Sequence, residues 1–485
     1  MMRKYVNDAN GKFKVLLKDD NGRTITRLLW GDAVEVLQTH GENTRVKARG
    51  LTGWVPGDVL TNEGLLELYI IDVGQGDGVL MRTPDDKWHL IDAGIESEKQ
   101  MTKKGAANFV RWKFIEDLGE PGVRLENVII SHSDFDHYGG LINLLAGKVT
   151  RPDRTFSVEV EHFYHCGVGR FADAPKLGDM VVGTVNPLPY TEYGVKQDGK
   201  FITELLTGKT SFCKPSRPFD DDFARLAALV GKVPKQIHRL SHRDNYLPGY
   251  GKGAGAVSIR ILGPILERID SGAYGLRDLG SESVTCNGHS VVLRVDYGEA
   301  RLLLTGDSNT ASQRLLLSYH DLHEFAADVA KGCHHGADDI DLRFVRAMKS
   351  RATVISSGDN ESYAHPRPLI LGASARYGRE AKSVKGEVLP PLLYSTELAR
   401  SVKLAHASRV REITDTANEL EAVEAEIKSE ESRAKYLRLD NTPISTDLIY
   451  GLINVRTDGT RVLCGYMKES SNDFDIQVFR AGVEP

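Results

Sequence analysis

The sequence contains few cysteines and no long apolar run, and these two absences exclude several classes of protein. Its 485 residues include five widely spaced cysteines and no Cys-x-x-Cys pair. An odd number without regular spacing argues for a reducing compartment and against a disulfide framework. No run of 18 apolar residues is present, so no membrane span is predicted. The first eight residues, Met-Met-Arg-Lys-Tyr-Val-Asn-Asp, lack the apolar core of a signal peptide. These features predict a cytoplasmic enzyme.

The chain also lacks an excess of positive charge. Its formal net charge is −5 with neutral histidines, which argues against a wholly basic nucleic-acid-binding protein but permits a local basic groove. Hydrophobic residues make up 41% and charged residues 27% of the chain, as in ordinary soluble globular proteins. The length is sufficient for two to four domains and at least one large core.

Residues 1–62 show the pattern of a small all-β unit. Short apolar runs at 13–17, 33–37 and 44–48 are separated by turn-forming residues and predict strands. The unit closes with Gly53-Trp54-Val55, followed by Pro-Gly-Asp. This ending resembles a bacterial Src-homology-3-type barrel, in which such a strand precedes a one-turn helix. The resemblance implies a module that binds peptides, glycans or another part of its own chain; a packing module without a ligand is the alternative.

The most informative stretch is Ser-His-Ser-Asp-Phe-Asp-His-Tyr-Gly-Gly at residues 131–140, directly after the apolar run 128–130. Side chains alternate along an extended segment, so His132, Asp134 and Asp136 can point the same way, and His137 follows at the turn. Four side chains of metal-binding type within six residues predict a metal-binding loop rather than an ordinary polar loop.

Three further segments carry polar residues of the same type. An apolar strand ends at Gly306-Asp307, a histidine pair stands at His334-His335, and His365 lies in the loop Tyr363-Ala-His-Pro-Arg-Pro. With the metal loop they predict two divalent cations, one held by His132 and Asp134, the other by Asp136 and His137. Asp307 is the candidate bridging carboxylate.

Imidazole and carboxylate ligands suit zinc, manganese or iron, and the aspartate at position 134 favours manganese. A water activated by two metal ions is expected to attack at phosphorus. His335 or His365 is then free to stabilise the pentacoordinate phosphorane or to protonate the leaving oxygen.

In their order, these segments resemble the metallo-β-lactamase superfamily, and most closely the soluble hydrolase domain of ComEC-type DNA-uptake proteins. The match covers roughly residues 65–375. The matching residues are Asp72-Val-Gly-Gln-Gly-Asp77, Leu90-Ile-Asp-Ala-Gly94, residues 131–140, Asn287-Gly-His-Ser-Val-Val-Leu293, Leu303-Leu-Thr-Gly-Asp307, His334-His-Gly336 and Tyr363-Ala-His-Pro366. The resemblance implies an α/β fold, an αββα sandwich with the metals at one edge of its two sheets.

The resemblance also implies roles for single residues. The family usually has histidine where Asp134 stands, although the ComEC-type branch tolerates aspartate there. For the third metal histidine we choose His289, with Asn287 and His165 as alternatives. Asp92 is expected to orient the metal loop. The predicted metal ligands are His132, Asp134, Asp136, His137, His289, Asp307 and His334. The predicted catalytic residues are Asp136, His335 and His365. The predicted substrate-binding residues are Asp77, Tyr363, Arg239 and Arg243.

A basic stretch lies within residues 232–260, with interleaved tyrosines at 246 and 250. It is interpreted either as an electropositive groove for a nucleic acid strand or as a solvated loop. Its basic residues are Lys232, Lys235, His238, Arg239, His242, Arg243, Lys252 and Arg260.

The C-terminal quarter begins with a helical pattern. Residues 397–439 contain no glycine or proline, and Ile413, Leu420, Ile427 and Ala434 recur every seven residues. This predicts a helical hairpin or short coiled coil, or alternatively an ordinary surface helix. A β-hairpin is expected over 448–464. The predicted domains are 1–62, 63–395 with an insertion at 150–285, 396–440, and a tail 441–485 packing on the catalytic domain.

The sequence thus predicts a metal-dependent phosphodiesterase, with a nuclease acting on DNA or RNA as the leading hypothesis. Small phosphodiesters such as a cyclic nucleotide or a phosphocholine ester are the first alternative, and a lactonase or thioesterase is the second. A regulatory module of a bacterial defence system, recruiting a protein partner through residues 1–62 or 397–439, is the non-enzymatic alternative. Self-association into a homo-oligomer is left open.

Overall fold

The computed structural model describes residues 2–8, 11–100, 103, 105–149, 155–358, 363, 365–396, 452–468 and 473–483. The chain divides into two compact units, one formed by residues 1–398 with 449–485 and the other by residues 399–448. The helix predicted over 397–439 lies outside the described residues. Within the described ranges, no helix is both long and apolar enough to cross a membrane.

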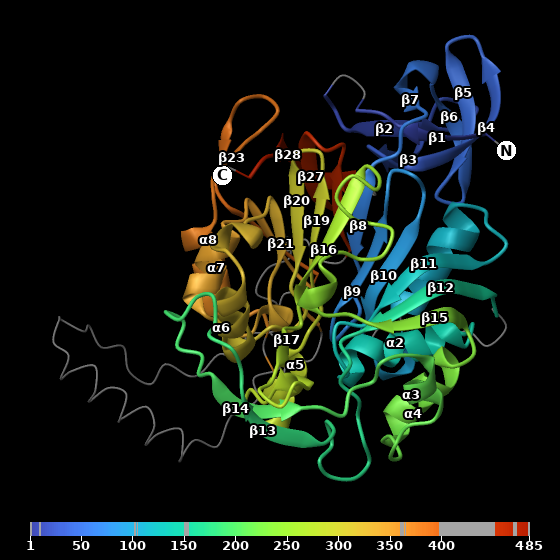
Figure 1. Cartoon of the computed structure of the whole chain (residues 1–485). Coiled ribbons are helices and arrows are strands. Elements are labelled where there is room, and N and C mark those ends of the chain that lie inside the picture. The colour runs from blue at the N-terminus through green and yellow to red at the C-terminus, as the bar shows by residue number, and fades with distance from the viewer. Residues whose placement is uncertain are drawn as a thin grey trace, which may run out of the picture. The chain divides into compact units, whose positions relative to one another are not determined.

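The N-terminal residues form a seven-stranded sheet of their own, visible in blue in Figure 1. Gly53 lets two of its strands approach closely, because an added Cβ would lie 2.5 Å from the Lys18 carbonyl oxygen. The predicted one-turn helix is present as a 3-10 turn at Gly57–Val59. The resemblance to a Src-homology-3-type barrel itself stays a prediction. In sheet order the strands are β3 (Thr24–Leu29), β2 (Lys14–Lys18), β6 (Leu51–Pro56), β5 (Asn43–Ala48), β4 (Ala33–His40), β1 (Met2–Val6) and β7 (Leu60–Thr61).

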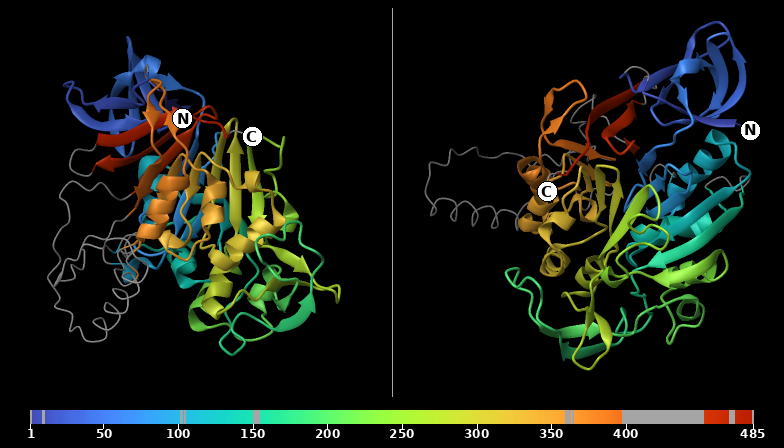
Figure 2. Two further views of the ribbon diagram at one scale, coloured as in Figure 1. Left: turned by 90° about the vertical axis from the view of Figure 1, so that its left-hand side faces the viewer. Right: turned by 45° about the horizontal axis from the view of Figure 1, so that its top comes forward.

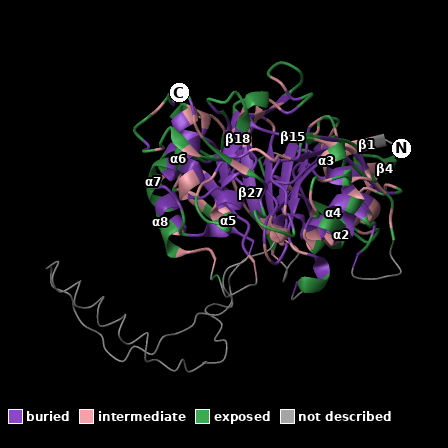
Figure 3. Ribbon diagram, turned by 60° about the horizontal axis from the view of Figure 1, so that its bottom comes forward, coloured by how far each residue is buried: buried purple, intermediate pink, exposed green. Residues whose placement is uncertain are grey.

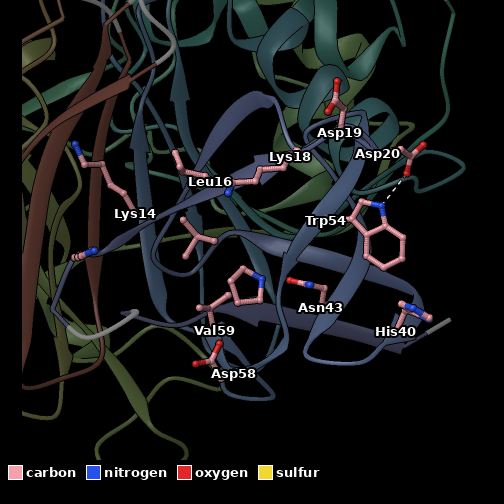
Figure 4. Close-up of a pocket in the computed structure, with 14 residues that line it drawn as sticks. Lys14, Leu16, Lys18, Asp19, Asp20, His40, Asn43, Trp54, Asp58 and Val59 are labelled. Atoms are coloured by element: carbon pink, nitrogen blue, oxygen red, sulfur yellow. Dashed lines mark hydrogen bonds between the residues drawn. The ribbon is translucent and has the colours of Figure 1, made fainter.

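A cavity of about 680 Å³ opens on this sheet (Figure 4). Leu16, Trp54 and Val59 supply its apolar lining, and lysines and aspartates surround them. The Trp54 indole nitrogen donates a hydrogen bond to Asp20 Oδ1 at 2.8 Å, which fixes the ring at the cavity wall.

Two larger sheets pack face to face below the N-terminal sheet in the view of Figure 1, and Figure 2 shows them from two other directions. They share one apolar core, in which Ile70 and Met81 of one sheet meet Ile259 and Leu302 of the other. The nine-stranded sheet has the order β15 (Pro234–Arg239), β12 (Val158–His165), β11 (Val123–Ile129), β10 (Trp88–Ala93), β9 (Gly78–Arg82), β8 (Leu66–Ile70), β26 (Ile453–Thr457), β27 (Arg461–Lys468) and β28 (Asp473–Arg480). The six-stranded sheet has the order β16 (Val257–Gly263), β19 (Val292–Tyr297), β20 (Ala300–Leu304), β21 (Val329–Lys331), β22 (Ala352–Ile355) and β25 (Leu392–Ser395).

Helices cover the outer face of each sheet. Helices α1 (Ala106–Arg111), α2 (Phe135–Leu145), α3 (Lys209–Cys213) and α4 (Asp221–Val230) pack on the nine-stranded sheet. Helices α6 (Thr310–Tyr319), α7 (Leu342–Met348) and α8 (Pro368–Tyr377) pack on the six-stranded sheet. Their inner faces are buried, and α3, α4, α6, α7 and α8 have exposed residues on their outer faces (Figure 3), whereas α1 and α2 have none. The predicted αββα sandwich preceded by a small β unit is therefore confirmed.

The stretch 150–285 contributes both to the sandwich and to a separate sheet. Strands β12 and β15 belong to the nine-stranded sheet and β16 to the six-stranded one, so only part of the expected insertion lies outside the sandwich. That part is a four-stranded sheet of β13 (Met180–Thr184), β14 (Asp198–Ile202), β18 (Tyr274–Arg277) and β17 (Leu266–Arg268). Helix α5 (Glu282–Gly288) follows it. A small two-stranded sheet pairs β23 (Ala381–Lys382) with β24 (Val388–Leu389).

The C-terminal tail completes the nine-stranded sheet. Strand β26 pairs antiparallel with β8, with Ile453 opposite Ile70. The turn at Asp458-Gly459 leads into β27, as the sequence predicts, and β28 adds a further strand to the expected hairpin. The tail is thus an integral part of the sandwich rather than an appendage.

A buried ion network joins this tail to the N-terminal sheet. Arg456 Nη2 lies 2.8 Å from Asp32 Oδ1, and Arg49 Nη2 lies 2.8 Å from Asp32 Oδ2. Arg456 also donates to the Trp30 carbonyl oxygen at 2.6 Å. Burial disfavours the charge of Asp32, but the guanidinium groups of Arg49 and Arg456 hold the pKa of that carboxyl well below its usual value. The two parts of the fold are therefore held together by buried charges that satisfy each other.

We expect Arg456→Met to lower the free energy of unfolding by about 3–5 kcal/mol, because Asp32 then loses one cation while remaining buried. Urea denaturation followed by circular dichroism measures this change. The matched control is Arg480→Met, at an exposed position of β28. Equal and small losses for Arg456→Met and the control would contradict this role.

Candidate metal centre

The predicted site residues gather where strands of both sheets end. In the nine-stranded sheet, β10 and β11 run parallel, and Asp92 stands at the end of the first and His132 just after the second. In the six-stranded sheet, β20 and β21 run parallel, and Asp307 and His335 follow them. The carboxyl ends of parallel strands meet at one edge of a sheet. The sandwich therefore brings four short polar segments, far apart in sequence, to a common edge.

Three imidazole nitrogens and one carboxylate converge at this edge. His137 Nε2 lies 3.2 Å and His335 Nε2 lies 2.8 Å from the same oxygen, Asp307 Oδ2. The two imidazole nitrogens are 3.3 Å apart. The rings of His132 and His137 have centroids 4.0 Å apart, and Asp136 reaches within 3.9 Å of His137 Nε2. Among the groups of side chains that could hold a metal ion, two share His137: His132 with His137 and Asp307, and Asp136 with His137 and His335.

Buried carboxylates orient two of these histidines. Asp92 accepts a hydrogen bond from His137 Nδ1 at 2.9 Å, and Asp77 accepts one from His335 Nδ1 at 3.1 Å. In each case the Nδ1 proton is fixed by the carboxylate, so Nε2 is turned toward Asp307. Such carboxylate–histidine pairs are typical of metal sites. Asp92 and His335 also have positive φ values of 54° and 53°, a strained backbone that occurs preferentially at functional sites.

A buried lysine anchors the second of these pairs. Lys331 Nζ lies 2.5 Å from Asp77 Oδ2 and donates hydrogen bonds to the carbonyl oxygens of Gly306 and Gly332 at 3.0 and 3.1 Å. It also lies 4.0 Å from Asp307 Oδ1. Lys331 thus ties the ends of β20 and β21 to the turn that carries Asp77. The sequence analysis did not select this residue, because one lysine at the end of an apolar strand carries no signal.

The charges at this edge favour a bound cation. Burial lowers the pKa of His335, but Asp307 and Asp77 outweigh it and raise the pKa to about 10. For His137, Asp307 and Asp92 outweigh burial in the same way and raise the pKa well above its usual value. In the described part of the chain, His132 Nε2 and Asp307 Oδ1 are buried without a hydrogen-bond partner. Buried polar atoms rarely stay unpaired, and this donor set fits a divalent metal ion.

A pocket of about 440 Å³ leads to these groups. It brings together several of the predicted site residues, while His132 and His137 lie fully buried behind it. The sequence analysis assigned His334 as a metal ligand and His335 as a catalytic residue, but the distances to Asp307 favour His335 as the ligand. His335 lies closer to Asp307 than His334 does, 2.8 Å against 3.8 Å for the respective Nε2 atoms. Of the predicted residues, the pocket is lined by Asp134, Asp136, Asp307, His334, His335, Tyr363 and His365.

The structure does not place His289 in this group. Its Nε2 donates to the Arg277 carbonyl oxygen at 2.7 Å, and none of the metal-competent groups within the described ranges contains it. The alternative, Asn287, lies in the last turn of helix α5 and lines the pocket instead, with Nδ2 3.2 Å from His334 Nε2. His165, the third option, is buried at the end of β12 and accepts a hydrogen bond from the Gly167 N–H through Nδ1.

Asp134 has an unexpected partner. Arg170, in the loop after β12, forms an ion pair with Asp134 Oδ1 and a second one with Glu282 at 2.8 Å. Arg170 Nε also donates to the Ser133 carbonyl oxygen at 3.1 Å. Asp134 Oδ2 remains 3.8 Å from His132 Nε2. One oxygen of this carboxylate is therefore held by an arginine, a contact that nothing in the sequence around Arg170 indicates.

Asp77 and the two predicted substrate-binding arginines are found elsewhere. Asp77 is buried behind His335 and orients it, so the prediction of direct substrate contact is not supported by its position. Neither Arg239 nor Arg243 lines the pocket. Arg239 packs against Gly167, and the Arg243 guanidinium lies over the Tyr274 ring at 4.6 Å.

Two basic residues of the stretch 232–260 are paired with acidic residues of other elements. Lys235 pairs with Glu161 at 2.5 Å and Arg260 with Glu324 at 3.0 Å. These positive charges are neutralised locally by acidic residues of neighbouring strands and turns, which a one-dimensional count of charges does not reveal.

Comparison with known proteins agrees with this arrangement. Residues 71–195 match the model of the metallo-beta-lactamase superfamily. The chain therefore contains a metallo-beta-lactamase domain. The predicted resemblance to that superfamily is confirmed, and the match begins directly after β8 and includes the whole of residues 131–140.

Two curated relatives bear names from competence systems, in line with the predicted ComEC-type branch. ComE operon protein 3 of Bacillus subtilis is 21% identical over 66% of this chain and 31% of its own length. Competence protein ComA of Neisseria gonorrhoeae is 31% identical over 21% of this chain and 15% of its own. The chain thus spans less than a third of either relative. Among solved structures, the metallo-beta-lactamase fold protein YhfI of Bacillus subtilis is 14% identical, with a TM-score of 0.27. The matched region is 59% of this chain and 85% of the YhfI chain.

We expect Asp77→Asn to weaken metal binding to the metallo-beta-lactamase domain by about 10–100-fold, the usual effect of losing a carboxylate that orients a ligand histidine. Competition with a chelating dye and metal analysis by mass spectrometry measure the affinity and the content. Asp338→Asn, at an exposed aspartate lining the pocket outside the donor groups, is the matched control. Equal affinities for both variants and the parent protein would contradict the orienting role of Asp77.

Proposed function

We propose that the protein is a metal-dependent hydrolase of phosphodiester bonds, and that its substrate is a nucleic acid. The observation that carries this proposal is the convergence of His137 and His335 on one oxygen of Asp307. A carboxylate between two imidazole-containing donor groups is the arrangement that a pair of divalent ions requires. The membership of residues 71–195 in the metallo-beta-lactamase superfamily and the names of the competence relatives support the class of reaction.

We further propose that the site holds two ions, zinc or manganese. His132 shares one donor group with His137 and Asp307, and Asp136 shares another with His137 and His335. When bound, two such ions polarise a phosphodiester and lower the pKa of a coordinated water. Asp307 would be shared between them, and its Oδ1, which has no hydrogen-bond partner among the described residues, is available for the second ion. The carboxylates of Asp134 and Asp136 at the pocket wall favour manganese.

The remaining pocket residues are positioned to act on the substrate. His365 lies beside the histidine pair, with ring centroids 6.1 Å from His334 and 6.4 Å from His335. Burial and then the charge of His335 lower the pKa of His365 to about 4, so it is neutral near pH 7. A neutral imidazole at this position can donate a hydrogen bond to the leaving oxygen or accept one from water.

Tyr363 extends the site outward from His365. The two rings stack at 5.8 Å with an interplanar angle of 26°, and 53% of the Tyr363 side chain is exposed. An exposed aromatic face beside a metal centre suits stacking of a nucleobase. A small phosphodiester is the second candidate substrate, because a pocket of about 440 Å³ also matches a single small molecule.

We expect Asp307→Ala to lower metal-dependent turnover by about 10²–10³-fold or more, because the carboxylate common to both donor groups is lost. The assay uses manganese or zinc with single-stranded DNA, double-stranded DNA, RNA and bis-p-nitrophenyl phosphate. Asp338→Ala is the control and is expected to retain turnover within a factor of about three.

Cleavage of the small diester without cleavage of any polymer would contradict the nuclease assignment. Absence of metal-dependent turnover on every substrate would contradict the hydrolase assignment as a whole, and would favour the regulatory module that recruits a partner.

A further inference from the structure

Arg367 is fixed to the turn that carries the histidine pair. Its backbone N–H donates a hydrogen bond to the Gly336 carbonyl oxygen at 2.7 Å. Gly336 has a φ of +83°, and a Cβ added to it would lie 2.6 Å from Pro366 Cβ. The two backbone segments are therefore in direct contact, and Arg367 immediately precedes helix α8. Its position relative to His334 and His335 is thus set by main-chain contacts rather than by a long flexible loop.

Arg367 is the single lysine or arginine among the described residues that line the pocket. Within the described ranges, no carboxylate lies within 4.0 Å of its guanidinium group. Its Nε atom is buried and has no hydrogen-bond partner there. Arg170, on the motif side of the site, differs because it pairs with both Asp134 and Glu282. A buried guanidinium nitrogen without a partner is costly, so its retention at a pocket wall points to a ligand that supplies the acceptor.

The chemistry of that ligand follows from the guanidinium and its surroundings. A planar fork of N–H donors with a permanent positive charge matches the oxygens of a phosphate group. The phosphate under attack would be held by the metal ions at Asp307. Arg367 is in neither donor group and follows His365, whose ring is already 6.1–6.4 Å from the histidine pair. Arg367 therefore stands on the pocket wall outside the donor groups, where it can contact a part of the substrate other than the bond being cleaved.

Resting on the proposed function, we propose that Arg367 binds a second phosphate, the neighbour of the cleaved phosphate along a nucleic acid strand. The site then distinguishes nucleotide chains, which carry such a neighbour, from small diesters, which carry one phosphate. The exposed face of Tyr363, stacked on His365, lies in the same part of the pocket and is available to the base of the intervening nucleotide. Arg367 thus acts as a determinant of substrate class rather than of the chemical step.

The kinetic test compares Arg367→Gln and Arg367→Lys with Arg376→Gln, an exposed arginine of the same helix. The substrates are bis-p-nitrophenyl phosphate, the thymidine dinucleotide, and that dinucleotide with an additional 5′- or 3′-terminal phosphate. We expect Arg367→Gln to raise KM by about 10–100-fold for one of the two phosphorylated dinucleotides, the one whose terminal phosphate reaches Arg367. For bis-p-nitrophenyl phosphate, KM and kcat should change by less than about twofold. Arg367→Lys should restore part of the loss, and Arg376→Gln should match the parent protein.

Two outcomes overturn the proposal. An equal loss on bis-p-nitrophenyl phosphate would mean that Arg367 contacts the cleaved phosphate or supports the fold, and thermal melting separates these two. No change on any phosphorylated dinucleotide would mean that the second phosphate is bound elsewhere or not at all.

A binding measurement keeps the test independent of turnover. Metal-loaded protein is titrated calorimetrically with thymidine 5′-monophosphate and with thymidine 3′,5′-bisphosphate. The parent protein is expected to bind the bisphosphate about tenfold or more tightly, and Arg367→Gln is expected to lose that difference. If no variant or parent hydrolyses any substrate but the difference in binding is present and depends on Arg367, the hydrolase proposal fails and the phosphate site stands. If the difference is absent in the parent protein, the phosphate site fails whatever the turnover.

Discussion

The structure depends on the convergence of buried charges where the two sheets meet. His137 from one sheet and His335 from the other approach the same oxygen of Asp307, and each is held by its own carboxylate, Asp92 or Asp77. Three buried carboxylates and two imidazoles are costly to remove from water unless they satisfy one another. Their mutual arrangement therefore holds the strand ends of the two sheets in place, and the same residues could hold a metal ion.

Buried ion networks recur wherever separate parts of the chain meet. Lys331 connects the two sheets through Asp77 and two carbonyl oxygens, and Arg456 connects the C-terminal tail to the N-terminal sheet through Asp32. The tail also completes the nine-stranded sheet through the pairing of β26 with β8. A change far from the metal centre in sequence can thus alter the frame that positions the centre, because strand β8 leads directly into the turn that carries Asp77.

The pocket combines a donor-rich base with an outer wall of different chemistry. Its base presents carboxylates and imidazoles, whereas Tyr363, His365 and Arg367 present aromatic rings and a guanidinium whose Nε has no hydrogen-bond partner among the described residues. Under the proposed function, the base would hold the phosphodiester with its metal ions and the wall would bind the neighbouring nucleotide. In this view the metallo-beta-lactamase domain supplies the reaction, and a few residues before α8 select the substrate.

The sequence by itself determined the strands, the metal loop and the superfamily. Alternating or continuous apolar runs predict strands locally. Residues 131–140 contain four side chains of metal-binding type within six residues. Both features can therefore be recognised without knowledge of the tertiary structure. Only the tertiary structure decided which distant residues complete the centre. His289 faces the Arg277 carbonyl oxygen and Asn287 faces the pocket, although they are two residues apart. Arg170, Lys331 and Arg367 acquire their roles from partners 36, 254 and 31 residues away in Asp134, Asp77 and Gly336. The direction in which a side chain points, and the residues that it contacts, depend on how strands and turns pack in three dimensions. The order of residues along the chain does not contain this information.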